Sequence, residues 1–184
     1  PVPGPIPSPW QQQDVGSVGV PGNATYADSE FTVTGSGVDI WNVADSFHFV
    51  YQPLLGNAVM TAKVEGLYGS GDGWPLAGVM IRQDLTGGSK EALSALTTGY
   101  GMSGDARITA NTSTVYQQGA LYYGSAWVRV TRTNNVFTAF QSADGTNWQA
   151  YFTNTINMSG TVYAGLAFTS HSNSLLGTAT FSHV

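Results

Sequence analysis

The sequence predicts an all-β protein, an antiparallel two-sheet β-sandwich that forms a single domain. Short runs rich in Val, Thr, Phe and Tyr recur along the chain, separated by Gly, Asn and Asp, as in strands joined by turns. Within these runs apolar residues alternate, as in Phe47, Phe49 and Tyr51, so one face of each strand is apolar. Helix-forming segments are nearly absent. The chain has 184 residues, and sandwiches of about 200 residues often form one domain.

A proline-rich segment precedes the predicted sandwich. Residues 1–9 read PVPGPIPSP, and alternate prolines favour an extended polyproline II spacer that holds two modules apart. We interpret residues 1–9 as a linker and residues 10–184 as one β-sandwich domain of a longer protein. A secreted protein whose signal peptide is cleaved just before this segment would have the same sequence, which is the alternative.

Eight segments have clear strand patterns: residues 30–34, 46–54, 58–67, 76–84, 126–133, 136–142, 161–170 and 177–184. Residues 89–96 (SKEALSAL) fit a strand with Leu93 and Ala95 facing inward, and one or two helical turns are the alternative. Two turns are legible, at residues 133–136 (TNNV) and at residues 142–148 (SADGTNW). In residues 76–84 the second face mixes polar and apolar residues, so we expect it to face solvent or line a groove.

The chain carries few charges. Only 9% of its residues are charged, six basic and eleven acidic, whereas a typical domain has about 25%. The basic residues form no cluster that could follow a phosphate backbone, so nucleic acid is not an expected partner. A membrane is not expected either, since no apolar run approaches the roughly 20 residues that span a bilayer. Weakly charged surfaces rich in Ser and Thr are commoner outside the cell, so we expect a secreted protein.

Catalytic patterns are missing from the sequence. The absence of Cys excludes thiol catalysis, thiolate zinc sites and disulfides. Glycosidases on this kind of fold need two carboxylates about 5.5 Å apart, and none of Glu30, Glu65 and Glu91 is paired with an acidic residue along a predicted strand. We therefore predict no catalytic residues.

Two aspartates in the segment 37–46 allow two interpretations. The side chains of Asp39 and Asp45 can cap backbone N–H groups of this loop. A calcium site that uses both carboxylates and loop carbonyls is the alternative, and calcium is the one cofactor for which the sequence offers ligands.

Aromatic residues indicate a sugar-binding surface. Neutral polysaccharides present apolar C–H faces and many hydroxyls, so they bind to exposed Trp or Tyr flanked by polar side chains. Trp41, Trp74 and Trp127 lie at predicted strand edges or loops, and Trp74 follows the flexible segment 69–73. Packing in the core or at its edge is the alternative for each Trp.

Polar residues complete the predicted sugar-binding set. Arg82 and Arg129 alternate with core residues, so each can reach sugar hydroxyls or pair with a carboxylate such as Asp84 or Asp45. The predicted carbohydrate-binding residues are Trp41, His48, Gln52, Trp74, Arg82, Trp127, Arg129 and His171.

Six blocks of the sequence carry a resemblance to a known family. They are residues 35–41 (GSGVDIW), 45–52 (DSFHFVYQ), 74–82 (WPLAGVMIR), 127–132 (WVRVTR), 142–148 (SADGTNW) and 164–171 (AGLAFTSH). In this order, over residues 35–184, the set resembles a bacterial family of concanavalin A-like (laminin G-like) β-sandwich domains. Members of this family resemble accessory modules joined to secreted carbohydrate-active enzymes and other large exported proteins, so the resemblance implies a jelly-roll fold and a carbohydrate-binding role. The catalytic family 16 glycoside hydrolases of this fold carry Glu, Asp and Glu at alternate strand positions, a run that is missing here.

Together these observations predict a non-catalytic carbohydrate-binding module. We expect a monomeric domain that holds a polysaccharide or oligosaccharide for a covalently linked catalytic domain. Two alternatives remain: a structural or protein-binding adhesion module of a large exported protein, and a polysaccharide lyase or hydrolase with an unrecognised site.

Overall fold

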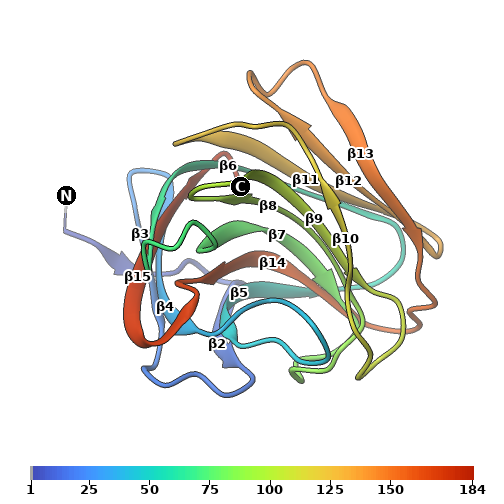
Figure 1. Cartoon of the computed structure of the whole chain (residues 1–184), viewed down its shortest axis with the longest axis horizontal. Helices are drawn as coiled ribbons and strands as arrows, with labels where there is room; N and C mark the ends of the chain where they lie inside the picture. The colour runs from blue at the N-terminus through green and yellow to red at the C-terminus, as the bar shows by residue number, and fades with distance from the viewer. Residues whose placement is uncertain (1) are drawn as a thin grey trace.

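The chain folds into two antiparallel sheets packed face to face, as Figure 1 shows for the computed structural model. The structure describes residues 2–184, and within this range the sheets have eight and seven strands and there is no helix. Accordingly, residues 2–184 hold no helix of the length and apolarity that a membrane crossing requires. The predicted fold class, an antiparallel two-sheet β-sandwich, is confirmed.

Neighbouring strands in each sheet are often distant in sequence. The eight-stranded sheet has the order β1 (Gly4–Pro5), β3 (Asn23–Ala27), β4 (Glu30–Gly37), β15 (Ser172–Ser182), β6 (Ala58–Tyr68), β11 (Ala126–Thr133), β12 (Val136–Ser142) and β13 (Gln149–Thr155). The seven-stranded sheet has the order β10 (Val115–Gln118), β9 (Gly101–Arg107), β8 (Glu91–Thr97), β7 (Leu76–Arg82), β14 (Val162–Thr169), β5 (Phe47–Leu54) and β2 (Gln11–Val15).

The predicted strands are present, two of them with the predicted bounds. β11 and β12 occupy residues 126–133 and 136–142, and the turn between them is the expected two-residue loop, in which Asn134 has a φ of 55°. Residues 91–97 form β8, so the strand interpretation of this segment is confirmed. The predicted facing is wrong, because Leu93 and Ala95 belong to an apolar cluster on the outer face of the seven-stranded sheet, whereas Ala92 and Leu96 belong to the core between the sheets. In the segment interpreted as a linker, Gly4 and Pro5 pair with Tyr26 and Thr25 of β3.

The main core lies between the two sheets. It consists of the residues of both sheets that point inward, which are every second residue along each strand. Burial of one large apolar side chain stabilises the folded state by about 1.5–3 kcal/mol. The fully buried members of this core include Val33, Val64, Val79, Leu96, Val128, Leu166, Phe168 and Phe181.

The outer face of the seven-stranded sheet is also largely buried. Every residue of β7, β8 and β9 is buried, and a second apolar cluster on this face joins Phe47, Phe49, Met80 and Leu93 to Ile40. Ile40 belongs to the loop of residues 38–46, which connects β4 to β5 and lies over the sheet. For residues 76–84 the sequence left two possibilities for this face, solvent or a groove. The solvent interpretation is wrong, because every residue of β7 is buried, and Leu76 at the start of β7 lines a cavity, described next.

Candidate functional site

A cavity of about 340 Å³ opens on the outer face of the seven-stranded sheet. This volume lies at the lower end of the range for small-molecule sites and suits a single ring-sized group. The strands contribute Leu76 from β7, Ser103 and Asp105 from β9 and Tyr116 from β10, and loops contribute the rest of the lining. The side chains of Ser103 and Asp105 point to the same side because they are two residues apart on one strand.

Trp74 forms one wall of the cavity, and its ring packs against that of Tyr100. Their rings are stacked, with centroids 4.2 Å apart and an interplanar angle of 29°. Gly73 makes this stack feasible: its φ is +92°, and a Cβ there would lie 2.8 Å from the Tyr100 ring. The backbone N–H of Trp74 donates a hydrogen bond to Asp72 Oδ1 over 3.0 Å. Trp74 is thus held in place and still 39% exposed, which leaves ring surface for a ligand.

Trp41 and Tyr116 form a second aromatic wall. The two rings meet edge to face, with centroids 6.0 Å apart and an angle of 81°. Trp41 lies in the loop after β4, and Tyr116 lies on the edge strand β10, where it pairs in register with Asp105. Trp41 is 40% exposed, so this wall also presents accessible aromatic surface.

His171 lies between two carboxylates at the rim. Its Nδ1 is 2.6 Å from Asp72 Oδ2, and its Nε2 is 3.5 Å from Asp39 Oδ2. Asp39 Oδ1 accepts a hydrogen bond from the backbone N–H of Ile40, and burial raises the pKa of Asp39. His171 and Asp39 both line the cavity, so they offer a donor and an acceptor to a bound polar ligand.

Asp105 is the most deeply buried charged group of the cavity. The residue is 2% exposed, and its Oδ2 accepts a hydrogen bond from the Ser103 hydroxyl over 2.7 Å. Burial raises the pKa of Asp105 to about 7. A carboxyl group with this pKa is a hydrogen-bond donor or acceptor near neutral pH, depending on what binds beside it.

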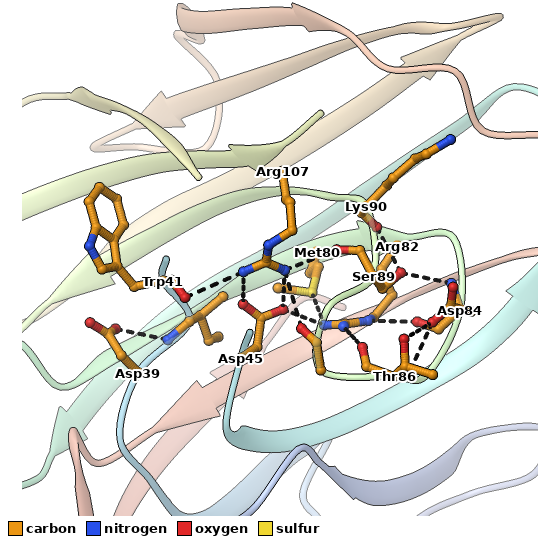
Figure 2. Close-up of polar contacts among 12 residues, drawn as sticks. Asp39, Trp41, Asp45, Met80, Arg82, Asp84, Thr86, Ser89, Lys90 and Arg107 are labelled. Atoms are coloured by element: carbon orange, nitrogen blue, oxygen red, sulfur yellow. Dashed lines mark hydrogen bonds and ion pairs between the residues drawn. The ribbon is translucent and has the colours of Figure 1, made fainter. Parts of the chain in front are cut away.

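A buried ionic network fixes the loop that carries Trp41. Arg107 Nη1 donates to Asp45 Oδ2 over 2.9 Å, and Arg82 Nη1 donates to the same oxygen over 3.2 Å (Figure 2). All three side chains are fully buried. Arg107 also donates to the backbone carbonyls of Trp41 and Asn42. Because Arg107 belongs to β9, the network ties residues 41–45 to the sheet.

The structure brings together four of the residues that the sequence singled out. Trp41, Trp74 and His171 of the predicted sugar-binding set line the cavity, together with Asp39, which the sequence assigned to loop caps or calcium. They come from three loops that are far apart in sequence.

Arg82 and Asp45 have a different role. Arg82 is fully buried and donates to Asp45 and, through Nε, to the backbone carbonyl of Asp84. The alternative interpretation of Arg82, that it pairs with a carboxylate, is confirmed, and the partner is Asp45. Asp45 has both oxygens occupied by guanidinium groups, so it is not available to a cation together with Asp39. Among residues 2–184, no group of three or more His and acidic side chains is arranged to hold a metal ion.

His48 and Gln52 lie away from the cavity. On β5 they alternate with the residues of the outer face, so they point toward the other sheet with Val50. His48 is 2% exposed and contacts Asp14 and Gln12 through its two ring nitrogens, and burial lowers its pKa. Gln52 is half-buried near the end of the strand.

Trp127 and Arg129 lie on the other sheet, on the outer face of β11. Arg129 stacks over the Trp148 ring at 3.6 Å from its centroid and donates to the Thr61 hydroxyl. Trp127 packs edge to face against Trp148, with centroids 6.4 Å apart. These contacts secure the turn of residues 142–148 and place both residues on the opposite side of the molecule from the cavity-bearing sheet.

Five cavity residues were not predicted as site residues: the apolar Ile40 and Leu76, and the polar Ser103, Asp105 and Tyr116. Residues 101–107 (GMSGDAR) alternate Ser, Asp and Arg with Met, Gly and Ala, which is a period-2 pattern that could have identified a strand with a polar face. For Tyr116, the sequence holds no comparable signal, because β10 is an exposed edge strand of four residues.

No protein-family model and no curated protein sequence matches the chain. Solved structures do match it. A functionally unknown protein from Saccharomyces cerevisiae superposes with a TM-score of 0.66 and 21% identity, over 88% of this chain and 89% of that one. A lectin from Bauhinia forficata in complex with GalNAc matches with a TM-score of 0.54 and 12% identity, over 95% of this chain and 90% of that one.

A larger protein contains the same fold as one part. A mutant of the GH43 protein BlXynB from Bacillus licheniformis matches with a TM-score of 0.57 and 11% identity, over 83% of this chain but 31% of that one. At these identities the likenesses establish the fold, which is the concanavalin A-like jelly-roll sandwich shared with lectins.

Proposed function

We propose that the protein is a non-catalytic carbohydrate-binding module, and that the cavity holds one residue of a polysaccharide chain. One observation carries the proposal: Trp41 and Trp74, 40% and 39% exposed, border the same cavity as Asp39, Asp105 and His171. Accessible indole rings can cover the apolar face of a sugar ring while the polar side chains bind its hydroxyls.

Two of the similar structures support this proposal. The Bauhinia forficata lectin of the same fold is in complex with GalNAc, and the GH43 protein contains the fold as less than a third of its chain. A domain of this kind attached to a secreted enzyme would keep the enzyme close to its polymer, because tethering raises the effective concentration.

The first test is the loss of one aromatic wall. Replacing Trp74 with Ala should weaken polysaccharide binding by about fivefold to tenfold, since an aromatic contact of this kind contributes about 1 kcal/mol. The measurement is affinity electrophoresis against a panel of neutral and anionic polysaccharides. The matched control is Trp127→Ala, which removes the same side chain from the opposite sheet and should leave affinity unchanged.

Two results would contradict the proposal. If no polysaccharide retards the protein, the structural or adhesion module becomes the better description. If Trp127→Ala lowers affinity and Trp74→Ala does not, the binding surface is the outer face of the eight-stranded sheet and not the cavity. Thermal melting of both variants checks that they remain folded.

Hydrolysis is a second candidate that one observation favours. Asp39 and Asp105 line the same cavity, and burial raises the pKa of both, which is how enzymes prepare a carboxylic acid for proton donation. Release of new reducing ends from a bound polysaccharide, abolished by Asp105→Asn, would establish this activity in place of binding alone.

A further inference from the structure

The cavity is anionic. Its acidic lining residues are Asp39 and Asp105. A third carboxylate, that of Asp72, contacts His171 at the rim of the cavity. No Lys or Arg lines it within the described chain. A ligand that carries a carboxylate or sulfate would meet like charge here, so the cavity favours a neutral or a cationic group.

Asp105 lacks a cationic partner although it is buried. Its hydrogen-bond donor among residues 2–184 is the neutral hydroxyl of Ser103. The nearest guanidinium along the strand, that of Arg107, donates instead to Asp45 and to backbone carbonyls, including those of Thr112 and Ser89. A buried carboxylate is normally paired with a cation, so the open position beside Asp105 suits a positively charged group supplied by a ligand.

The surroundings of Asp105 confirm that its charge is unbalanced. In register, β8 places the apolar Leu93 beside it and β10 places Tyr116 beside it. The further charges that act on Asp105 are those of Asp39 and Asp45, and both oppose its ionisation. A bound cation would offset this repulsion.

The aromatic walls favour the same kind of group. Faces of Trp and Tyr attract cations that have lost part of their hydration, and the attraction is strongest for Trp. Trp41, Tyr116 and Trp74 line the same cavity as Asp105, so an ammonium group that enters it can meet both aromatic ring surface and a carboxylate.

We propose that the cavity binds a sugar residue that bears a free amino group, with the ammonium beside Asp105 and the ring against Trp74. The ligand class is a hexosamine unit of a polysaccharide that lacks N-acetyl groups. This inference rests on the proposed carbohydrate-binding function and specifies its substrate. Acetylation of the amine removes the charge, so the N-acetylated sugar loses the pairing with Asp105.

The test is a comparison of four oligosaccharide classes of equal length by calorimetry at 0.15 M salt. The probes are glucosamine oligomers, their N-acetylated counterparts, glucose oligomers with the same linkage, and galacturonate oligomers. We expect the glucosamine oligomers to bind at least tenfold more tightly than the N-acetylated and glucose oligomers, and the galacturonate oligomers to give no binding signal.

Two substitutions that each remove one negative charge separate the cavity from the overall charge of the protein. Asp105→Asn should lower the affinity for glucosamine oligomers at least tenfold more than it lowers the affinity for glucose oligomers. Asp28→Asn removes an exposed carboxyl at the turn between β3 and β4 and should change neither affinity. If both variants lose the same affinity for glucosamine oligomers, the inference is overturned, because binding would then depend on the net charge of the protein and not on Asp105.

The oligosaccharide comparison needs no variant and also separates this inference from the proposed function. Equal affinity for glucosamine and glucose oligomers would overturn the inference and leave carbohydrate binding intact. Absence of binding to all four classes would overturn both. Choline is the last probe: if it binds as tightly as the glucosamine oligomers, the cavity recognises a cation and not a sugar, and the inference fails.

Discussion

Asp105 lies in an environment that stability alone would not select. Its pKa is raised by burial from 3.8 to about 7, and no cationic side chain of the described chain pairs with it. Proteins accept such unfavourable burial mainly at functional sites, where stability is exchanged for binding or catalysis. This places Asp105 at the centre of the candidate site.

The raised pKa of Asp105 makes a prediction about stability and pH. Below pH 3.8 the group is protonated in both the folded and the unfolded chain. As the pH rises to about 7, the unfolded chain releases the proton first, so ionisation increasingly favours unfolding. The two pKa values differ by about 3, and one unit corresponds to about 1.4 kcal/mol. Asp105→Asn should therefore raise the free energy of unfolding by about 2–4 kcal/mol at pH 8 and leave it nearly unchanged at pH 4.

Urea denaturation of the wild type and of Asp105→Asn at both pH values measures this effect. The comparison isolates one group, because other titrating residues such as His48 and Glu91 contribute to both proteins. A variant that is less stable at pH 8 would contradict the assignment, since it would mean that the carboxylate has a favourable partner in the folded protein.

The loop of residues 38–46 lies over the outer face of the seven-stranded sheet and forms one side of the cavity. It delivers Asp39 and Trp41 to the lining, and it is held by the Asp45 carboxylate between Arg82 and Arg107 (Figure 2). A buried carboxylate with two guanidinium partners is strongly coupled to folding, because its removal leaves two buried charges without compensation.

Removal of the Asp45 charge should therefore destabilise the protein strongly. We expect Asp45→Asn to lower the free energy of unfolding by about 3–5 kcal/mol, measured by urea denaturation at pH 7. The exposed Asp28 serves as the control, and Asp28→Asn should change stability by less than about 0.5 kcal/mol. If Asp45→Asn is as stable as the wild type, the network does not anchor the loop.

Strands differ in how well the sequence predicts them. The difference depends on whether the buried residues of a strand are apolar or polar. β11 alternates buried Val128 and Val130 with half-exposed residues, so its bounds follow from the apolar pattern. β9 is buried on both faces, yet Ser103, Asp105 and Arg107 occupy its outer face. Ser103 and Asp105 line the cavity and Arg107 donates to the loop that lies over this face, so apolarity alone underestimates how deeply this strand is buried.

The candidate site illustrates a similar limit. An exposed Trp74 could be proposed from the sequence because it follows the Gly-rich segment 69–73, where a role in the core is hard to arrange, and Trp41 and Trp74 do meet at one cavity. Trp127 and Arg129 carry the same local signals but lie on the other sheet. Which loops converge is decided by strand order, and this information is absent from any short segment.

At the scale of the whole molecule, strand order itself is the least predictable feature. The alternation of apolar residues and the near absence of helix signals are sufficient for a two-sheet antiparallel sandwich. They do not specify that β14 lies between β7 and β5 or that β10 is an edge. These neighbours are set by packing between residues far apart in sequence, for which the chain offers no local pattern.

The position of β15 affects how the protein can be made. β15 is the last described strand, and it pairs with β4 on one side and β6 on the other, in the middle of the eight-stranded sheet (Figure 1). During synthesis on the ribosome, β4 and β6 therefore emerge long before the strand that joins them. Until residues 172–182 have left the ribosomal exit tunnel, both strands have unpaired edges, which are prone to association with other chains.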